Sequence, residues 1–195
     1  MRIGVSRRFV VWTERALFAG AFSLLVYCGV VLMDTWIFES RERREFDSQL
    51  IAPQPIAKAS LPIVSGGLIG RIEIRQLGLS AIVIEGTSWA TLQRAVGHIA
   101  GTALPGAPGN VGISGHRDTF FRPLRNIHPN DLIKLTTLTG EFNYRVVSTR
   151  IVDPAEVSVL KSGVNESLTL VTCYPFYFVG PAPERFVVRA ERTVL

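Results

Sequence analysis

Short segments in which apolar and polar residues alternate fill the C-terminal part of the sequence, and they limit the fold more than any other feature. In RIEIRQLG, Ile72 and Ile74 fall on one face of an extended chain and charged residues fall on the other. Glycine, proline, asparagine or aspartate separates most of these segments. Many short strands with regular turn signals predict an all-β fold, either a closed barrel or a sandwich. The other strand segments are SAIVIEG, GNVGISG, DLIKLTTLTG, EFNYRVVSTRIVD, SLTLVTC and ERFVVRAERTVL.

One segment of the same region lacks this alternation. TSWATLQRAVGHI, residues 87–99, predicts a short helical insertion. Thr87 or Ser88 can cap its start, and Leu92 and Ala95, three residues apart, can face the core.

An uncharged apolar run extends from Ala16 to Met33, near the N-terminus. A helix that spans a membrane needs about this length. Trp12 and Trp36 flank the run, as aromatic residues do at membrane interfaces. A cleaved signal peptide is the alternative, but its apolar core would be shorter, roughly 7–15 residues, and the following DTWIFES offers no small-residue cleavage site. We therefore predict a retained transmembrane anchor at residues 16–37.

Charges around the apolar run indicate its orientation. Four arginines precede the run, and three follow it at positions 41, 43 and 44. The modest excess favours a cytoplasmic N-terminus, residues 1–15, in a single-pass cell-membrane protein with its body on the extracytoplasmic side. Residues 38–67 read as a stalk, because the charge run ESRERREF leads into a proline- and glycine-rich stretch. The folded domain is expected at residues 68–195.

The charge of the chain does not favour a nucleic-acid partner. The formal net charge is +5, but residues 68–195 hold 13 Lys and Arg against 10 Asp and Glu. No basic stripe or patch with interleaved aromatic residues is present in the sequence of that region.

The two cysteines lie in different environments. Cys28 lies inside the apolar run, where a cysteine behaves as a small hydrophobic residue. Cys173 ends the segment SLTLVTC, and Pro175 stops regular pairing shortly after it. A membrane-buried Cys28 cannot reach Cys173, which is therefore an unpaired thiol in an oxidising compartment. It is either an inert buried residue or a nucleophile, and its partners decide between the two.

A thiol nucleophile needs a cation or histidine to hold the thiolate and a donor to stabilise the oxyanion. His116 is the best-placed histidine, because it follows a strand segment and a glycine. Arg185 and Arg189 fall on one face of the last strand, and either can supply the donor. The spacings, 57 residues from His116 to Cys173 and 12 from there to Arg185, do not establish proximity. The other histidines fit structural positions: His128 a surface turn and His98 the end of the predicted helix.

Three motifs in this region resemble those of the sortases, a family of membrane-anchored cysteine transpeptidases. TLVTC matches the T-L-x-T-C signature, GNVGISGHRDTFFRPL the segment with the histidine, and APERFVVRAER the strand with the arginine. The ending CYPFYFVGPAPERFVVRA looks most like class D. The resemblance implies an eight-stranded barrel with its site in a groove at the rim. It also implies Cys173 as the nucleophile, His116 as the acid/base and Arg185 as the electrostatic stabiliser.

Acyl transfer is the chemistry that this resemblance implies. The substrate would be an exported protein with a C-terminal LPXTG-like sorting signal, and the acceptor an amine of a peptidoglycan stem peptide or precursor. Thr172 is a candidate for a hydroxyl contact with the peptide. For Asp118 we favour a role in stabilising a turn over a role as the third member of a catalytic triad. No cofactor is implied. Calcium activates some relatives, but the acidic residues here are too scattered to assign a site.

Two other functions remain open at this point. A pilin-polymerising sortase would use the same chemistry with a lysine side chain as the amine, although neither a lid segment nor an Asp-Pro-aromatic anchor is evident. A membrane-tethered, non-enzymatic β-domain would use Cys and His to bind zinc. Zinc sites usually show close ligand pairs, and this sequence has none.

Overall fold

The computed structural model describes residues 11–30, 33, 66–178 and 180–193. They belong to two compact units, one within residues 1–40 and one within 41–195. In the first unit, Val11–Val30 is a helix that is long and apolar enough to cross a membrane. The predicted anchor at 16–37 overlaps this helix. Residues 31–32 and 34–37 of that anchor, residues 1–10 and most of the predicted stalk lie outside the described residues.

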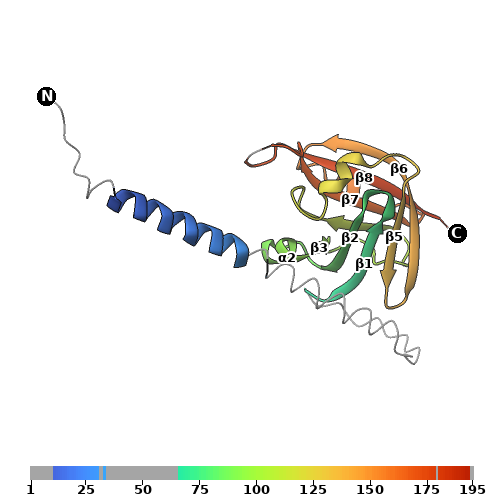
Figure 1. Ribbon diagram of the computed structural model, residues 1–195. Helices are drawn as coiled ribbons and strands as arrows, with labels where there is room; N and C mark the ends of the chain where they lie inside the picture. The colour runs from blue at the N-terminus through green and yellow to red at the C-terminus, as the bar shows by residue number, and fades with distance from the viewer. Residues whose placement is uncertain (1–10, 31–32, 34–65, 179, 194–195) are drawn as a thin grey trace. The chain divides into compact units, whose positions relative to one another are not determined.

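The second unit is a closed barrel of eight strands in the order β1-β2-β3-β4-β7-β8-β6-β5. This confirms the predicted all-β class. Most of the strands are labelled in Figure 1. The β2–β3 and β4–β7 pairs are parallel and the other pairs are antiparallel. The strands are β1 (Leu68–Ile74), β2 (Leu79–Glu85), β3 (Val96–His98), β4 (Asn110–Ser114), β5 (Leu132–Thr137), β6 (Gly140–Val152), β7 (Ser167–Tyr174) and β8 (Glu184–Thr193). The helical elements are η1 (Arg75–Leu77), α2 (Trp89–Arg94), η2 (Arg122–Asn126) and η3 (Val157–Leu160).

Alternate residues of each strand fill the barrel interior. Ile72 and Ile74 of β1 have no exposed surface, as the alternating pattern predicted. Tyr144 of β6 is also fully buried, and its hydroxyl has no hydrogen-bond partner within the described part of the chain. Burial raises the pKa of Tyr144 to about 12, because a phenolate is poorly solvated in the core.

The predicted helix at residues 87–99 is correct only in its first half. Ser88 caps α2 by accepting a hydrogen bond of 3.2 Å from the Thr91 N–H, and the helix ends at Arg94. The following residues form β3, parallel to β2. A Cβ atom at Gly97 would collide with the carbonyl oxygen of Gly86, so this strand passes too close to its neighbour for any side chain. The second half of the predicted helix is thus the strand β3, which the alternation pattern did not reveal.

His98 consequently lies in β3 and not at the end of a helix. It is only 2% exposed. Its Nδ1 lies 2.7 Å from Glu85 Oε2, and its Nε2 lies 3.0 Å from the Ala103 carbonyl oxygen, which can only accept. Nε2 is therefore the donor in its contact with this carbonyl oxygen. The side chain joins β2, β3 and the segment that leads to β4.

Candidate active site

Cys173 and Arg185 are direct neighbours in the barrel wall. The strands β7 and β8 are antiparallel, and Cys173 is paired with Arg185 in their ladder. Residues paired in this way project to the same face, with Cβ atoms about 4.5–5.5 Å apart. The register thus brings together a thiol and a guanidinium that the spacing in the sequence could not place.

Both side chains project from the outer face of the barrel. Leu168 and Leu170 on β7 and Val188 on β8 are fully buried in the core. Because side chains alternate along a strand, Cys173 and Arg185 point away from that core. Cys173 is a free and partly exposed thiol. The sulfur is therefore partly accessible from outside the barrel.

His116 approaches the same end of the barrel from β4. This strand is parallel to β7, with Ser114 paired to Val171. The Gly115 N–H donates to the Val171 carbonyl oxygen at 3.2 Å, so the two chains remain adjacent at that point. Two residues beyond that pair, the chains reach His116 and Cys173. The proposed acid/base, nucleophile and stabiliser thus come from the adjacent strands β4, β7 and β8 at one rim.

The imidazole of His116 packs against the indole of Trp89. The ring centroids are 5.5 Å apart and the ring planes meet at 72°, an edge-to-face contact. Trp89 is the first residue of α2 and is 69% exposed. Its indole therefore covers part of the histidine ring while facing solvent itself.

Arg185 is held by the backbone around it. Its Nη1 donates to the carbonyl oxygens of Glu184 at 3.0 Å and Ala182 at 3.3 Å. A guanidinium has five N–H donors. The side chain can therefore keep both contacts and still offer a donor to a carbonyl oxygen beside Cys173.

Arg189 has a different environment. Its Nη1 donates to Thr169 Oγ1 at 3.1 Å, and the Thr169 hydroxyl donates to Asn110 Oδ1 at 2.9 Å. Asn110 Nδ2 in turn donates to the Val159 carbonyl oxygen at 3.3 Å. This chain of hydrogen bonds connects β8 through β7 and β4 to η3, so Arg189 is part of the framework of the barrel wall.

Two further residues singled out in the sequence have structural contacts. Thr172 is 2% exposed, lies on the face of β7 opposite to Cys173, and donates its hydroxyl to the Gly115 carbonyl oxygen at 2.8 Å. It ties β7 to the residue before His116, and its contact with a peptide stays a prediction. Asp118 is 71% exposed, and its carboxylate lies 3.6 Å from Arg117 Nε.

Arg117 is a residue that the sequence pattern did not distinguish. Its guanidinium is buried and donates to backbone carbonyl oxygens in the segment between β7 and β8. A charged residue directly after His116 looks like any surface arginine in the sequence. Only the packing shows that it is enclosed.

The remaining histidine is peripheral to this site. His128 is exposed, and its backbone N–H donates to Asp131 Oδ2 at 2.9 Å, which confirms the predicted surface turn. Among the residues that the structure describes, no group of three or more His, Cys, Asp or Glu side chains is arranged to hold a metal ion.

Comparison with known proteins gives one consistent family. The family model described as the sortase domain matches residues 72–193. Sortase D of Bacillus subtilis strain 168 is 37% identical over 136 residues, which cover 69% of each chain.

Solved structures agree with that match. The Clostridium perfringens sortase D5 transpeptidase superposes with a TM-score of 0.72 and 29% identity, over 80% of this chain and 99% of that one. Clostridium perfringens sortase C, solved with its C-terminal cell wall sorting motif, superposes with a TM-score of 0.64 and 26% identity, over 90% of this chain and 100% of that one.

Proposed function

This chain belongs to the sortase family, class D, and we propose that it is a membrane-anchored cysteine transpeptidase that attaches exported proteins to the cell wall. The substrate in this proposal is a C-terminal sorting signal resembling LPXTG. The main support is the meeting of Cys173, Arg185 and the His116 segment at one rim of the barrel. The helix Val11–Val30 is long and apolar enough to serve as a single-pass anchor. The excess of arginines before the apolar run supports a domain on the extracytoplasmic side.

In the first half-reaction, the Cys173 sulfur attacks the carbonyl carbon of the Thr–Gly bond, or its equivalent, in the signal. The carbonyl oxygen gains negative charge, which the Arg185 guanidinium offsets from across the β7–β8 ladder. His116 gives a proton to the departing amine, and a thioester with Cys173 remains. Covalent capture divides the exchange of one amide for another into two steps.

In the second half-reaction, an incoming amine attacks the thioester. His116 now takes a proton from that amine, and the thiolate of Cys173 leaves. The product carries a new amide bond to the acceptor, which we propose is a peptidoglycan stem peptide or precursor. This sequence predicts ping-pong kinetics. The proposed chemistry uses only side chains of this chain, and assays with calcium and with EDTA test for a metal requirement.

A peptide-library assay tests the proposal. The protein is incubated with LPXTG-related peptides, and the mass of the intact protein reports the covalent adduct. A stem peptide and a lysine-containing pilin-like peptide are then offered as acceptors, with Cys173→Ala as the control. An adduct that forms on Cys173 and passes to the stem peptide supports attachment to the cell wall. Transfer to the lysine peptide alone indicates a pilin polymerase, and the absence of any adduct contradicts the proposed substrate.

A further inference from the structure

Arg117 directly follows His116 and carries a charge in a buried position. Its exposed fraction is only 7%. A charged group removed from water is costly unless hydrogen bonds satisfy its donors. The groups that accept from Arg117 therefore explain why it is enclosed, and most of them belong to one segment, the described residues 175–178 and 180.

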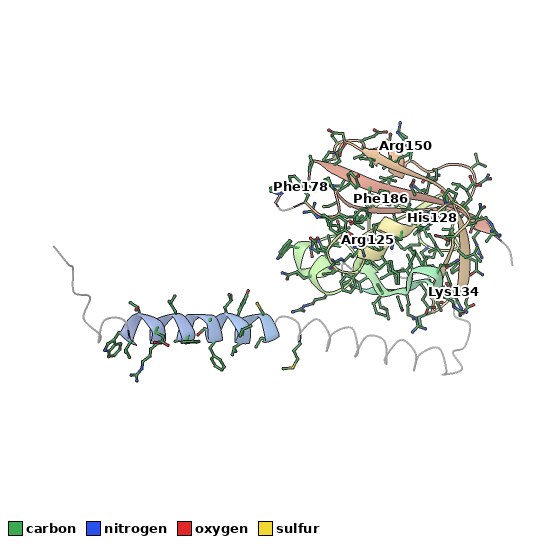
Figure 2. All side chains as sticks on the ribbon, turned by 45° about the horizontal axis from the view of Figure 1, so that its top comes forward. Arg125, His128, Lys134, Arg150, Phe178 and Phe186 are labelled. Carbon is green, nitrogen blue, oxygen red and sulfur yellow. The ribbon has the colours of Figure 1, made fainter. Side chains whose placement is uncertain are left out.

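Three backbone carbonyls of this segment accept hydrogen bonds from the guanidinium. Nη1 donates to Pro175 at 3.1 Å, and Nη2 donates to Phe178 at 2.7 Å and Gly180 at 3.1 Å. The guanidinium carbon also lies 6.0 Å from the centre of the Phe178 ring. Figure 2 shows Phe178 on the part of this segment that extends beyond the strands. Three acceptors on one planar group restrain both the position and the orientation of the segment.

The two ends of the segment continue into the strands of the candidate active site. Cys173 is the penultimate residue of β7 before it, and Arg185 is the second residue of β8 after it. We propose that Arg117 is a positioning residue. It holds the segment that links Cys173 on β7 to Arg185 on β8 at a fixed place relative to His116. The inference rests on the roles proposed above for these three residues. Arg117 acts through the backbone and does not touch the substrate.

The shape of the guanidinium is part of this role. Lysine would keep the charge, but its ammonium group is a compact point charge that cannot reproduce the planar arrangement of donors. Arg117→Lys should therefore leave the charge in place and still release part of the segment. Alanine would remove the charge as well and leave the carbonyls without their partner.

Arg125 provides a matched control, because it contacts the same segment in a different way. Its Nη1 donates to the Tyr177 hydroxyl at 2.6 Å, and its guanidinium carbon lies 5.5 Å from the centre of that ring. The residue is exposed, and both contacts are with the Tyr177 side chain and not with the backbone. Arg125→Ala thus removes an arginine that contacts the segment, while the hydrogen bonds from Arg117 to the backbone carbonyls of the segment remain.

The first measurement needs no substrate. The full chain is purified in detergent, and the rate of alkylation of Cys173 by iodoacetamide is followed against pH. Mass spectrometry of the peptide that contains Cys173 separates it from Cys28. We expect Arg125→Ala to show the same pH dependence of the alkylation rate as the wild type. In Arg117→Ala and Arg117→Lys this pH dependence should shift toward that of His116→Ala. This readout remains informative even if no sorting peptide reacts, so it separates failure of this inference from failure of the proposed substrate.

The second measurement divides the effect between kcat and KM with a reactive sorting peptide. Misplacement of reacting groups by about 1 Å can cost about 10²-fold, so kcat should fall by that order in both Arg117 variants while KM changes less. Added guanidinium ion should restore part of the rate of Arg117→Ala. Thermal melting identifies folded variants, and Arg117→Lys is the deciding variant if Arg117→Ala does not fold. A folded Arg117→Lys with the wild-type alkylation profile and kcat would overturn the positioning role.

Discussion

Replacement of Arg185 by alanine should separate its role from that of Arg189 on the same face of β8. Arg185 is paired with Cys173, and Arg189 is paired with Thr169, four residues farther along the strand. At about 3.4 Å per residue, roughly 13–14 Å separates the two Cα atoms. A carbonyl oxygen held at Cys173 is therefore close to Arg185 only, because the hydrogen bond to Thr169 holds Arg189 away from it.

The expected cost of Arg185→Ala follows from this placement. Loss of one oxyanion donor usually lowers the rate about 10²–10³-fold, equivalent to about 2.7–4 kcal/mol. Arg185→Lys should recover part of the rate, since it restores a charge but not the planar donors. Arg189→Ala should leave the rate near that of the wild type and lower the free energy of unfolding by about 1–3 kcal/mol, because the buried Thr169 loses a partner.

The assay is the rate of acyl-enzyme formation on Cys173, measured with a sorting-signal peptide by mass spectrometry of the intact protein. Urea unfolding of the same variants gives the stability. Normal acylation by Arg185→Ala together with lost acylation by Arg189→Ala would show that the two arginines have the opposite roles.

Three other predictions concern the site, the core and the domain boundary. His116→Ala should lower transpeptidation about 10²–10⁴-fold, whereas His128→Ala should retain wild-type rates; equal activity of both variants would remove the acid/base role. The pKa of Tyr144 rises from 10.0 to about 12 in the folded state, so above pH 10 the unfolded state loses a proton that the folded state keeps. The free energy of unfolding should therefore fall by up to about 1.4 kcal/mol per pH unit between these values, and urea unfolding of Tyr144→Phe should lack this loss. A fragment that starts near Leu68 should fold without the N-terminal residues, because the predicted linker separates the two parts, and its circular dichroism and cooperative melting provide the check.

Much of the barrel could be predicted because its strands are long enough to show alternation. RIEIRQLG contains several inward and outward positions, and the buried Ile72 and Ile74 follow that pattern. β3 could not be found in this way, since three residues, one of them Gly97, contain too few side chains to define a face. Its existence depends on close packing against Gly86, which is a tertiary contact.

The residues of the candidate site could be singled out by type in the sequence, but their arrangement could not be predicted. Cys173 and His116 each end a strand segment, which singled them out in the sequence. Their common location depends on β4 lying beside β7, and the role proposed for Arg185 depends on the register of β7 with β8. Neither the strand order nor the register can be deduced from one strand at a time. The enclosure of Arg117 likewise comes from carbonyls 58 or more residues away in the chain.

The position of β7 between β4 and β8 also has a consequence for when the proposed site can form during folding. The parallel ladder pairs Val111 with Leu168, so forming this contact closes a long loop and costs conformational entropy. Pairings between distant parts of a chain make folding slow, typically milliseconds to seconds in barrels of this kind. In the mechanism proposed above, Cys173 lacks its His116 partner until β4 and β7 pair. The appearance of enzymatic reactivity would therefore report closure of the barrel, and refolding could be followed by activity as well as by spectroscopy.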